Sequence, residues 1–248
     1  VEDRNRTAPF PFCGNRFEFR AVGSSQNCSF PIAVCNTIMA SGMSALSALI
    51  EGGMSHRDAV AQMFKEHRHV IFTGNGYSEE WLTESAKRGL PNLKNTPQAV
   101  AQFNSEKAKA LFKELGIFTE EECDARAEIM YENYITTLSV EVDTLISMVE
   151  TGILPACTKD MATYAAMPAL AGERKATYEG IKIETDKLKD IFGKRPHDDL
   201  KAEATYICDT IKPQMVEVRR LVDKAEGLIE KELYPYPTYE ALIYSHHS

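Results

Sequence analysis

Three charged side chains alternate with two phenylalanines near the start of the chain, in the segment Arg16-Phe17-Glu18-Phe19-Arg20. Strict alternation is typical of a β-strand, which places Arg16, Glu18 and Arg20 on one face. Arginine binds phosphates and carboxylates with a planar, bidentate geometry, and a carboxylate is a preferred ligand of hard divalent cations. The pattern therefore fits a site for a phosphoryl group and its metal, although a solvated strand face with a ladder of charges explains it equally well.

A second polar segment, Asp3-Arg4-Asn5-Arg6-Thr7, precedes this strand. The first twenty residues contain four arginines against three acidic residues, whereas the whole chain has a formal net charge of −8 and a pI near 5.4. An arginine cluster on an acidic protein indicates a small anionic ligand rather than a polyanion. The acidic balance also argues against a general nucleic-acid-binding protein.

Turn and cap residues divide the remainder of the chain into helices. Pro31 fits the first turn of a helix that begins near Ser29 and ends at Gly52-Gly53. Thr119 and Glu122 form a capping box at the start of a long helix. Other helices are expected over about 55–72, 78–88 and 96–116.

Two apolar stripes at heptad spacing predict helices that pack in a bundle. The first stripe comprises Ile135, Leu138, Val142, Leu145 and Val149. The second comprises Ile207, Ile211, Met215, Val218, Val222, Ala225 and Ile229. Gly152 and Pro155 are expected to interrupt the first helix, and Pro213 is expected to kink the second.

The least polar stretch, Ile32–Ile50, contains several polar residues and lacks basic flanks. A helix that is buried on all sides is therefore expected there, and not a membrane span. The six cysteines form no C-x-x-C pair and have no zinc-like spacing, so they are expected to be reduced and buried in a cytoplasmic protein. His67 and His69 do not share a helix face, and no metal role is expected for histidine.

The run N-R-T followed by N-R-F-E-F-R-A-V-G-S-S resembles the catalytic signature of the glutamine synthetase family. Four further motifs resemble the type III branch of that family and are spread over the whole chain. They are F-T-G-N-G-Y-S-E-E-W (72–81), G-L-P-N-L-K (89–94), G-I-L-P-A (152–156) and Y-P-Y-P-T-Y (234–239).

The resemblance implies a fold that is α+β overall and predominantly α in this chain. The end of a glutamine-synthetase-type catalytic sheet would be followed by a helical bundle. Residues 1–146 would form the C-terminal part of the catalytic domain, and residues 147–248 a C-terminal helical domain. Because the chain starts at Val1 without an initiator Met, we interpret it as a fragment of a longer protein that is inactive alone.

The resemblance also implies an activity, the ATP-dependent ligation of ammonia to the γ-carboxylate of glutamate through γ-glutamyl phosphate. Arg6 would contact the ATP phosphates and the transferred phosphoryl group, and Arg16 would lie on the nucleotide side. Glu18 would bind the second of two Mg²⁺ (or Mn²⁺) ions, and Arg20 would bind the glutamate side chain and its acyl phosphate. Pro11 stands where the shorter forms of the family have another arginine.

The partners implied in this way are glutamate, ammonia, ATP and further copies of the protein in stacked rings, with no nucleic acid and no membrane. An alternative from another class is a non-catalytic helical module for interaction or oligomerisation.

Overall fold

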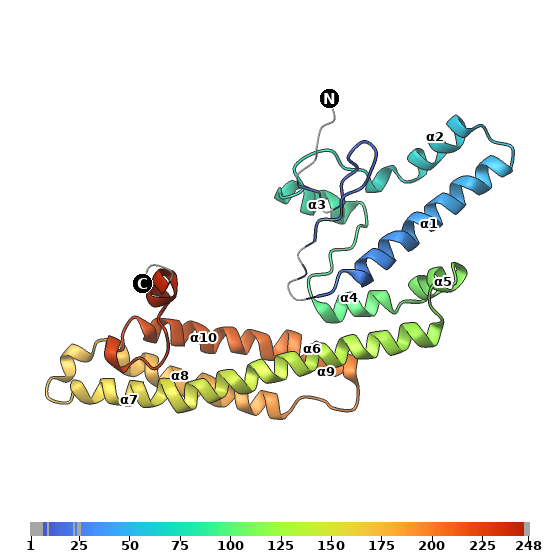
Figure 1. Cartoon of the computed structure of the whole chain (residues 1–248). Helices are drawn as coiled ribbons and strands as arrows, with labels where there is room; N and C mark the ends of the chain where they lie inside the picture. The colour runs from blue at the N-terminus through green and yellow to red at the C-terminus, as the bar shows by residue number, and fades with distance from the viewer. Residues whose placement is uncertain (1–6, 9, 22, 24–25, 246–248) are drawn as a thin grey trace. The chain divides into compact units, whose positions relative to one another are not determined.

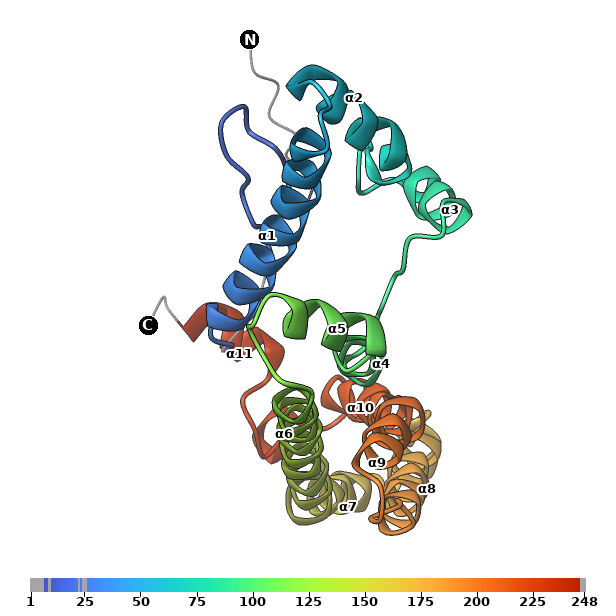
Figure 2. The same cartoon turned by 90° about the vertical axis from the view of Figure 1, so that its right-hand side faces the viewer.

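The structure is a computed structural model that describes residues 7–8, 10–21, 23 and 26–245. The chain divides into two units (Figures 1 and 2), one of residues 1–94 and 102–123 and the other of residues 95–101 and 124–248. The described residues are predominantly helical, and their β-structure is limited to one isolated antiparallel bridge. The predicted predominance of helix is confirmed, whereas the expected end of a catalytic sheet is not seen within these residues.

The helices of the first unit are α1 (Ser29–Glu51), α2 (His56–Glu66), α3 (Glu79–Lys87) and α5 (Glu106–Glu114), with a 3₁₀ turn η1 (Arg68–Val70). α1 packs against α2 and α5. Its end at Gly52-Gly53 is as predicted, because Gly53 adopts φ +97° and the N–H of Met54 bonds the carbonyl of Leu49 at 3.2 Å. This is the Schellman arrangement, which favours glycine at the position of positive φ.

Serine caps set the boundaries of the shorter helices. The Ser78 hydroxyl accepts from the N–H of Trp81 at the start of α3, as its position before an acidic first turn predicts. The helix expected over 96–116 is divided into α4 (Thr96–Phe103) and α5, because the Ser105 hydroxyl accepts from the N–H of Ala108 and begins a new helix. The helix expected over 55–72 ends earlier, at Glu66.

α1 is far more exposed than its apolar composition predicts. Among its residues only Thr37 is buried, and its large exposed side chains are Ile32, Ile38, Met39 and Met43. The prediction of a helix buried on all sides is therefore wrong within the described residues, where α2 and α5 contact it along only part of its surface. By length and composition alone α1 could cross a membrane, but core helices of soluble proteins pass the same test.

The second unit is a helical bundle. It contains most of α4, α6 (Glu120–Met148), η2 (Val149–Ile153), α7 (Leu154–Thr163), η3 (Pro168–Ala171), α8 (Arg174–Gly193), α9 (Leu200–Tyr206), η4 (Ile207–Ile211), α10 (Lys212–Glu226), η5 (Lys231–Leu233) and α11 (Tyr239–Tyr244). α8 packs along α10 and also contacts α7 and η4, and both views show these helices running together (Figures 1 and 2).

The predicted cap and stripes of the bundle are confirmed. The N–H of Thr119 bonds the Glu122 carboxylate at 2.8 Å, and the N–H of Glu122 bonds the Thr119 hydroxyl at 3.2 Å. The two stripes supply much of the core, and only Leu145 and Met215 among their members are not fully buried. Burial of these branched side chains is the main stabilising contribution to such a bundle.

The two prolines do not end their helices. η2 and η4 are π-helical turns. η2 directly precedes Leu154-Pro155 at the start of α7, and η4 directly precedes Lys212-Pro213 at the start of α10. A π turn widens the hydrogen-bonding pattern, which accommodates a ring that has no N–H to donate. The expected interruption at Gly152 and Pro155 is therefore wrong, since α6, η2 and α7 follow one another without a break.

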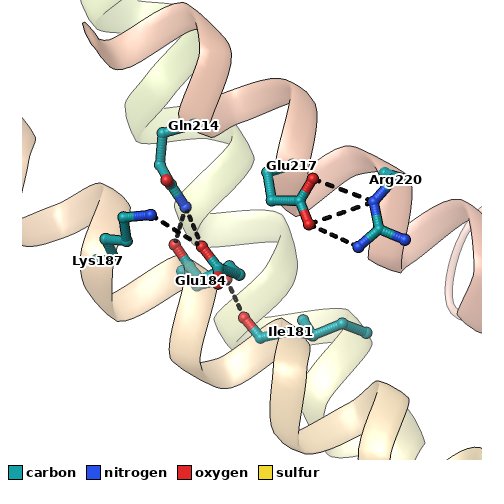
Figure 3. Close-up of polar contacts among 7 residues, drawn as sticks. Ile181, Glu184, Lys187, Gln214, Glu217 and Arg220 are labelled. Carbon is teal, nitrogen blue, oxygen red and sulfur yellow. Dashed lines mark hydrogen bonds and ion pairs between the residues drawn. The ribbon is translucent and has the colours of Figure 1, made fainter.

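Polar contacts join α8 to α10 at the edge of the core (Figure 3). The buried Gln214 amide donates to both the carbonyl and the carboxylate of Glu184, at 3.0 and 2.7 Å, and Lys187 pairs with the same carboxylate at 3.5 Å. Because one amide nitrogen satisfies two acceptors on one residue, the register of the two helices is fixed at this point.

One boundary between the two units lies at residue 123, within α6. The expected domain boundary at residues 146–147 also lies within α6. The proposed catalytic and helical domains of 1–146 and 147–248 stay a prediction about the whole protein. None of the six cysteines forms a disulfide, as expected, but only Cys13, Cys123 and Cys157 are buried, and Cys28 is exposed.

Candidate functional site

A tight turn, and not a long strand, positions the Arg16–Arg20 segment. The N–H of Cys13 bonds the carbonyl of Arg16 at 2.7 Å, and the N–H of Glu18 bonds the carbonyl of Pro11 at 3.1 Å. Gly14 has φ +82° at the first central position of the turn, which a two-residue hairpin requires. The chain thereby reverses direction, and Pro11, whose carbonyl accepts from Glu18, is buried in the hairpin.

Phenylalanine rings gather on one side of this hairpin. Phe17 stacks on Phe10 with ring centres 5.0 Å apart and lies 5.3 Å from Phe12, and Phe19 meets Phe10 edge-on at 6.3 Å. Such contacts stabilise a hairpin that would be marginal alone.

The Glu18 carboxylate lies between two guanidinium groups. Its Oε1 accepts from Nη2 of Arg16 at 3.0 Å, and its Oε2 accepts from Nη2 and Nε of Arg20 at 2.7 and 3.2 Å. The predicted sharing of one face by these three residues is therefore observed. The side chain of Glu18 is 21% exposed and that of Arg20 28%, whereas Arg16 is 60% exposed.

The Glu18 carboxylate holds the positively charged guanidinium groups of Arg16 and Arg20 in place. Exposed ion pairs contribute little to stability, so the cluster does not account for the fold of the hairpin. Two guanidinium groups beside one carboxylate leave a net positive charge, and their N–H groups match the oxygens of a phosphoryl or carboxylate ligand. The cluster is thus suited to an anionic ligand. Arg6, the fourth residue assigned to the site from the sequence, lies outside the described residues.

Metal ligands are sparse in the part of the chain that the structure describes. It contains no group of three or more His, Cys, Asp or Glu side chains that could hold an ion. The rings of His67 and His69 lie 6.4 Å apart and tilted, and His197 faces Glu203 at 3.4 Å. Glu18 fits one ligand position of a divalent ion, so a complete oxygen shell requires ligands from outside these residues.

Trp81 is a packing anchor for the segment before α3. Its ring stacks on Phe72 with centres 3.9 Å apart, and the guanidinium of Arg88 lies 5.5 Å from its ring centre. Arg88 also bonds the carbonyl of Ile71 at 2.9 Å and the carboxylate of Glu84 at 2.8 Å. This arginine is therefore engaged in holding the segment before α3.

One contact near the site was not predicted from the sequence. Thr7, the residue after Arg6, bonds Gly76 of the loop before α3, 69 positions further along the chain. The sequence features that relate to this contact are a threonine next to a candidate arginine and a pair of glycines in a distant motif. Spacing alone could not join the two segments.

Comparisons with known proteins assign the chain to a class. Residues 57–168 match the family described as the glutamine synthetase C-terminal domain. Over 98% of its length, the chain is similar to a type-3 glutamine synthetase of Dictyostelium discoideum, with 34% identity, and it covers 37% of that relative. Glutamine synthetases of Butyrivibrio fibrisolvens and Bacteroides fragilis are 34% and 29% identical, and the chain covers 38% and 37% of them.

The matching segment thus corresponds to the domain that lies at the C-terminus of glutamine synthetases. Along nearly its whole length the chain is similar to the C-terminal part of glutamine synthetases, and its type-3 relative agrees with the branch that the sequence motifs indicate. It spans less than two fifths of the length of these curated relatives.

Proposed function

We propose that the whole protein is a glutamine synthetase of type III that uses ATP to join ammonia to the γ-carboxylate of glutamate. The observation that carries this proposal is the Arg16–Glu18–Arg20 cluster, in which both oxygens of one carboxylate accept bonds from guanidinium groups. It lies in a chain whose relatives are named glutamine synthetases.

The reaction has two steps. An oxygen of the glutamate γ-carboxylate attacks the γ-phosphorus of ATP, the bond to the bridging oxygen breaks, and ADP leaves. The nitrogen of ammonia then attacks the carbonyl carbon of the γ-glutamyl phosphate, inorganic phosphate leaves with the bonding electrons, and the nitrogen loses a proton. Both steps concentrate negative charge on oxygen, so fixed positive groups accelerate them.

The arginines have separate roles in this proposal. Arg20 binds the γ-carboxylate of glutamate and later the acyl phosphate, because it lies beside Glu18 at the partly buried end of the cluster. Arg16 is more exposed and faces the nucleotide phosphates. Arg6 contacts the β- and γ-phosphates and the phosphoryl group in transfer. In each case the planar fork of the guanidinium fixes two oxygens at once.

Glu18 is the residue of this chain that would hold a divalent ion, Mg²⁺ or Mn²⁺. When bound, such an ion neutralises phosphate charge and orients the transferred group. Glu18 also holds Arg16 and Arg20 in position through the ion pairs already described. Since the chain covers 37% of its type-3 relative, the other metal ligands and the ammonia site are assigned to the rest of the protein. Assembly into a homo-oligomer is part of the same proposal.

The test is steady-state formation of glutamine by the whole protein and by its Glu18→Gln variant. Glutamine keeps the shape of the side chain but removes the charge that holds two arginines and a metal ion. We expect turnover to fall by several orders of magnitude with the fold unchanged by circular dichroism. Glu217→Gln is the matched control, because Glu217 forms an exposed pair with Arg220 on α10 (Figure 3).

Two results would contradict the proposal. Near-normal turnover of Glu18→Gln at saturating Mg²⁺ would remove Glu18 from the site. Absence of ATP-dependent glutamine formation by the whole protein would favour the non-catalytic helical module.

A further inference from the structure

An open hollow lies between the 3₁₀ turn η1 and helix α3 in the first unit. Its volume is about 600 Å³, which is within the range of small-molecule sites. The residues that line it are Arg68, His69, Ile71, Phe72, Thr73 and Arg88. Two guanidinium groups, an imidazole and a hydroxyl therefore share one concave surface with two apolar side chains.

Hydrogen bonds and ring stacking hold two walls of this hollow in place. Nη1 of Arg88 donates to the carbonyl of Ile71 at 2.9 Å, and its Nε donates to the carboxylate of Glu84 at 2.8 Å. The ring of Phe72 stacks on Trp81 with ring centres 3.9 Å apart. Because both contacts join the segment before α3 to α3 itself, the walls are organised before any ligand binds, which lowers the cost of binding.

The described residues that line the hollow include cations and no carboxylate. Glu84, the counter-charge of Arg88, lines a neighbouring hollow together with Glu79 and Glu80. The ring of Phe72 is shared by the two hollows. Since the whole chain has a formal net charge of −8, this cationic hollow is a local exception, and a concave positive surface attracts small anions.

Arg68 is the cation in the hollow that is available to a ligand. Its side chain is exposed, and it forms no ion pair within the described part of the chain. By contrast, Arg16, Arg20 and Arg88 each pair with a carboxylate. A guanidinium group without a counter-charge can bind a carboxylate through two parallel hydrogen bonds.

We propose that this hollow binds a small organic carboxylate. Glu84 offsets the charge of Arg88, so the charge of Arg68 remains, and it matches one monoanionic group. The carboxylate pairs with Arg68, and the apolar body of the ligand lies against Phe72 and Ile71, which is 44% exposed. Burial of that apolar surface adds to the affinity. Binding at this hollow does not depend on the proposed activity.

The chain contains a single tryptophan, and this gives a direct readout of binding. Trp81 stacks on Phe72, which lines the hollow, so its fluorescence should respond to a bound ligand. Titration of the 248-residue chain with cyclohexanecarboxylate is expected to give a saturable change, with a dissociation constant of about 0.1–10 mM. Isothermal titration calorimetry measures the same constant independently.

Two further probes separate the charge of the ligand from its apolar body. Cyclohexanecarboxamide has the shape of the acid without its charge, and acetate has the charge without the ring. Each is expected to bind about tenfold more weakly than cyclohexanecarboxylate, or weaker still, because each lacks one of the two contributions.

Arg68→Gln tests the assigned cation. It is expected to weaken binding of cyclohexanecarboxylate about 10- to 100-fold, the range for a lost hydrogen bond to a charged group, and to leave binding of the amide unchanged. Arg57→Gln is the matched control, since Arg57 is an exposed arginine of α2 that also forms no ion pair within the described residues. Circular dichroism should show the same helix content in both variants.

Three results would overturn this site. They are the absence of a saturable response to cyclohexanecarboxylate, equal affinities for the acid and its amide, and equal losses of affinity in Arg68→Gln and Arg57→Gln. The last result would indicate that the negative ligand responds only to the overall charge of the chain.

Discussion

The hydroxyl of Tyr236 donates to the carbonyl of Met148, 88 residues earlier, at 3.0 Å. Met148 ends α6, and the π turn η2 follows it. The Tyr236 ring lies so close to Gly152 in this turn that an added Cβ would overlap the hydroxyl oxygen and would be 2.8 Å from the ring. The motifs G-I-L-P-A and Y-P-Y-P-T-Y, far apart in the sequence, are therefore two sides of one contact.

We expect Gly152→Ala to lower the free energy of unfolding by about 1–3 kcal/mol, because the methyl group displaces the tyrosine ring. In a Tyr236→Ala background the same change should be neutral or stabilising, since alanine favours helix over glycine by about 1 kcal/mol. Denaturant unfolding followed by circular dichroism measures both values. Gly193→Ala, which has open space for a methyl group, is the control. An equal loss in the two backgrounds would show that the tyrosine is not the obstacle.

A buried carboxylate joins three parts of the second unit. Asp160 of α7 is 1% exposed and accepts from Nε of Arg174 at 3.1 Å, from the hydroxyl of Tyr178 at 2.7 Å and from the N–H of Glu230 at 3.0 Å. Arg174 also bonds the carbonyl of Leu228 at 2.6 Å. The carboxylate therefore links α7, α8 and the segment that follows α10.

Asp160→Ala should lower the free energy of unfolding by about 3–5 kcal/mol, since it leaves a partly buried guanidinium without its counter-charge. Tyr178→Phe should cost about 1.5–3 kcal/mol, the range for a hydrogen bond to a charged group. Asp186→Ala is the matched control, because its pair with Lys182 is exposed and should contribute about 0–1 kcal/mol. Comparable losses for Asp160→Ala and Asp186→Ala in urea unfolding would contradict this assignment.

Cys157 lies near the same carboxylate, one turn earlier in α7. Burial, with a further contribution from the charge of Asp160, raises the pKa of its thiol from 9.0 to about 12. The thiolate is the reactive form, so Cys157 should resist alkylation at pH 8 until the chain unfolds. Exposed Cys28 should react first. Mass spectrometry after timed alkylation checks this order, and early labelling of Cys157 would contradict it.

The raised pKa of Cys157 also predicts the sign of a pH dependence. The folded state holds this proton more tightly than the unfolded state, so the contribution is complete below about pH 9 and is lost as pH rises towards 12. Comparison with Cys157→Ala isolates this contribution from other groups. The free energy of unfolding of the unmodified protein should fall more steeply between pH 9 and 11 than that of the variant. Parallel curves would show that the thiol does not titrate differently on folding.

Signals that act within a few residues were reliable guides to this fold. The Thr119–Glu122 capping box and the glycine end of α1 depend only on neighbouring backbone groups, so the sequence predicted them. The apolar stripes follow from helical periodicity alone. The π turns were missed because they depend on how a proline is accommodated inside a packed bundle, which spacing does not reveal.

The candidate site was also predicted only in part. A spacing of two residues was enough to place Arg16, Glu18 and Arg20 on one face. The contact of Thr7 with Gly76 was not predicted, because it depends on segments that meet only in the folded chain. The tight turn at Gly14 was also missed, although it involves only the neighbouring residues 13–16. The exposure of α1 was not predicted either, because composition indicates an apolar helix but not which elements cover it.

Replacement of single arginines by lysine separates the two ligands of the proposed site. Arg20 uses Nε and Nη2 together on Glu18, and lysine keeps the charge but loses this planar fork. Loss of a bidentate contact made mainly in the transition state lowers turnover about 10- to 1000-fold, or about 1.4 to 4 kcal/mol. For Arg20→Lys in the whole enzyme, we expect the KM for glutamate to rise together with this loss.

Arg6→Lys should give the complementary result, because Arg6 is assigned to phosphate. Its KM for ATP or its turnover should suffer while the KM for glutamate stays near normal. Steady-state kinetics on both variants, with each substrate varied in turn, measures the difference. Arg220→Lys serves as the control, since Arg220 pairs with Glu217 on the exposed surface of α10 and should leave both constants unchanged. If Arg20→Lys disturbed only ATP and Arg6→Lys only glutamate, the assignment of ligands to these arginines would be wrong, even though the family would stand on the similarity to its relatives.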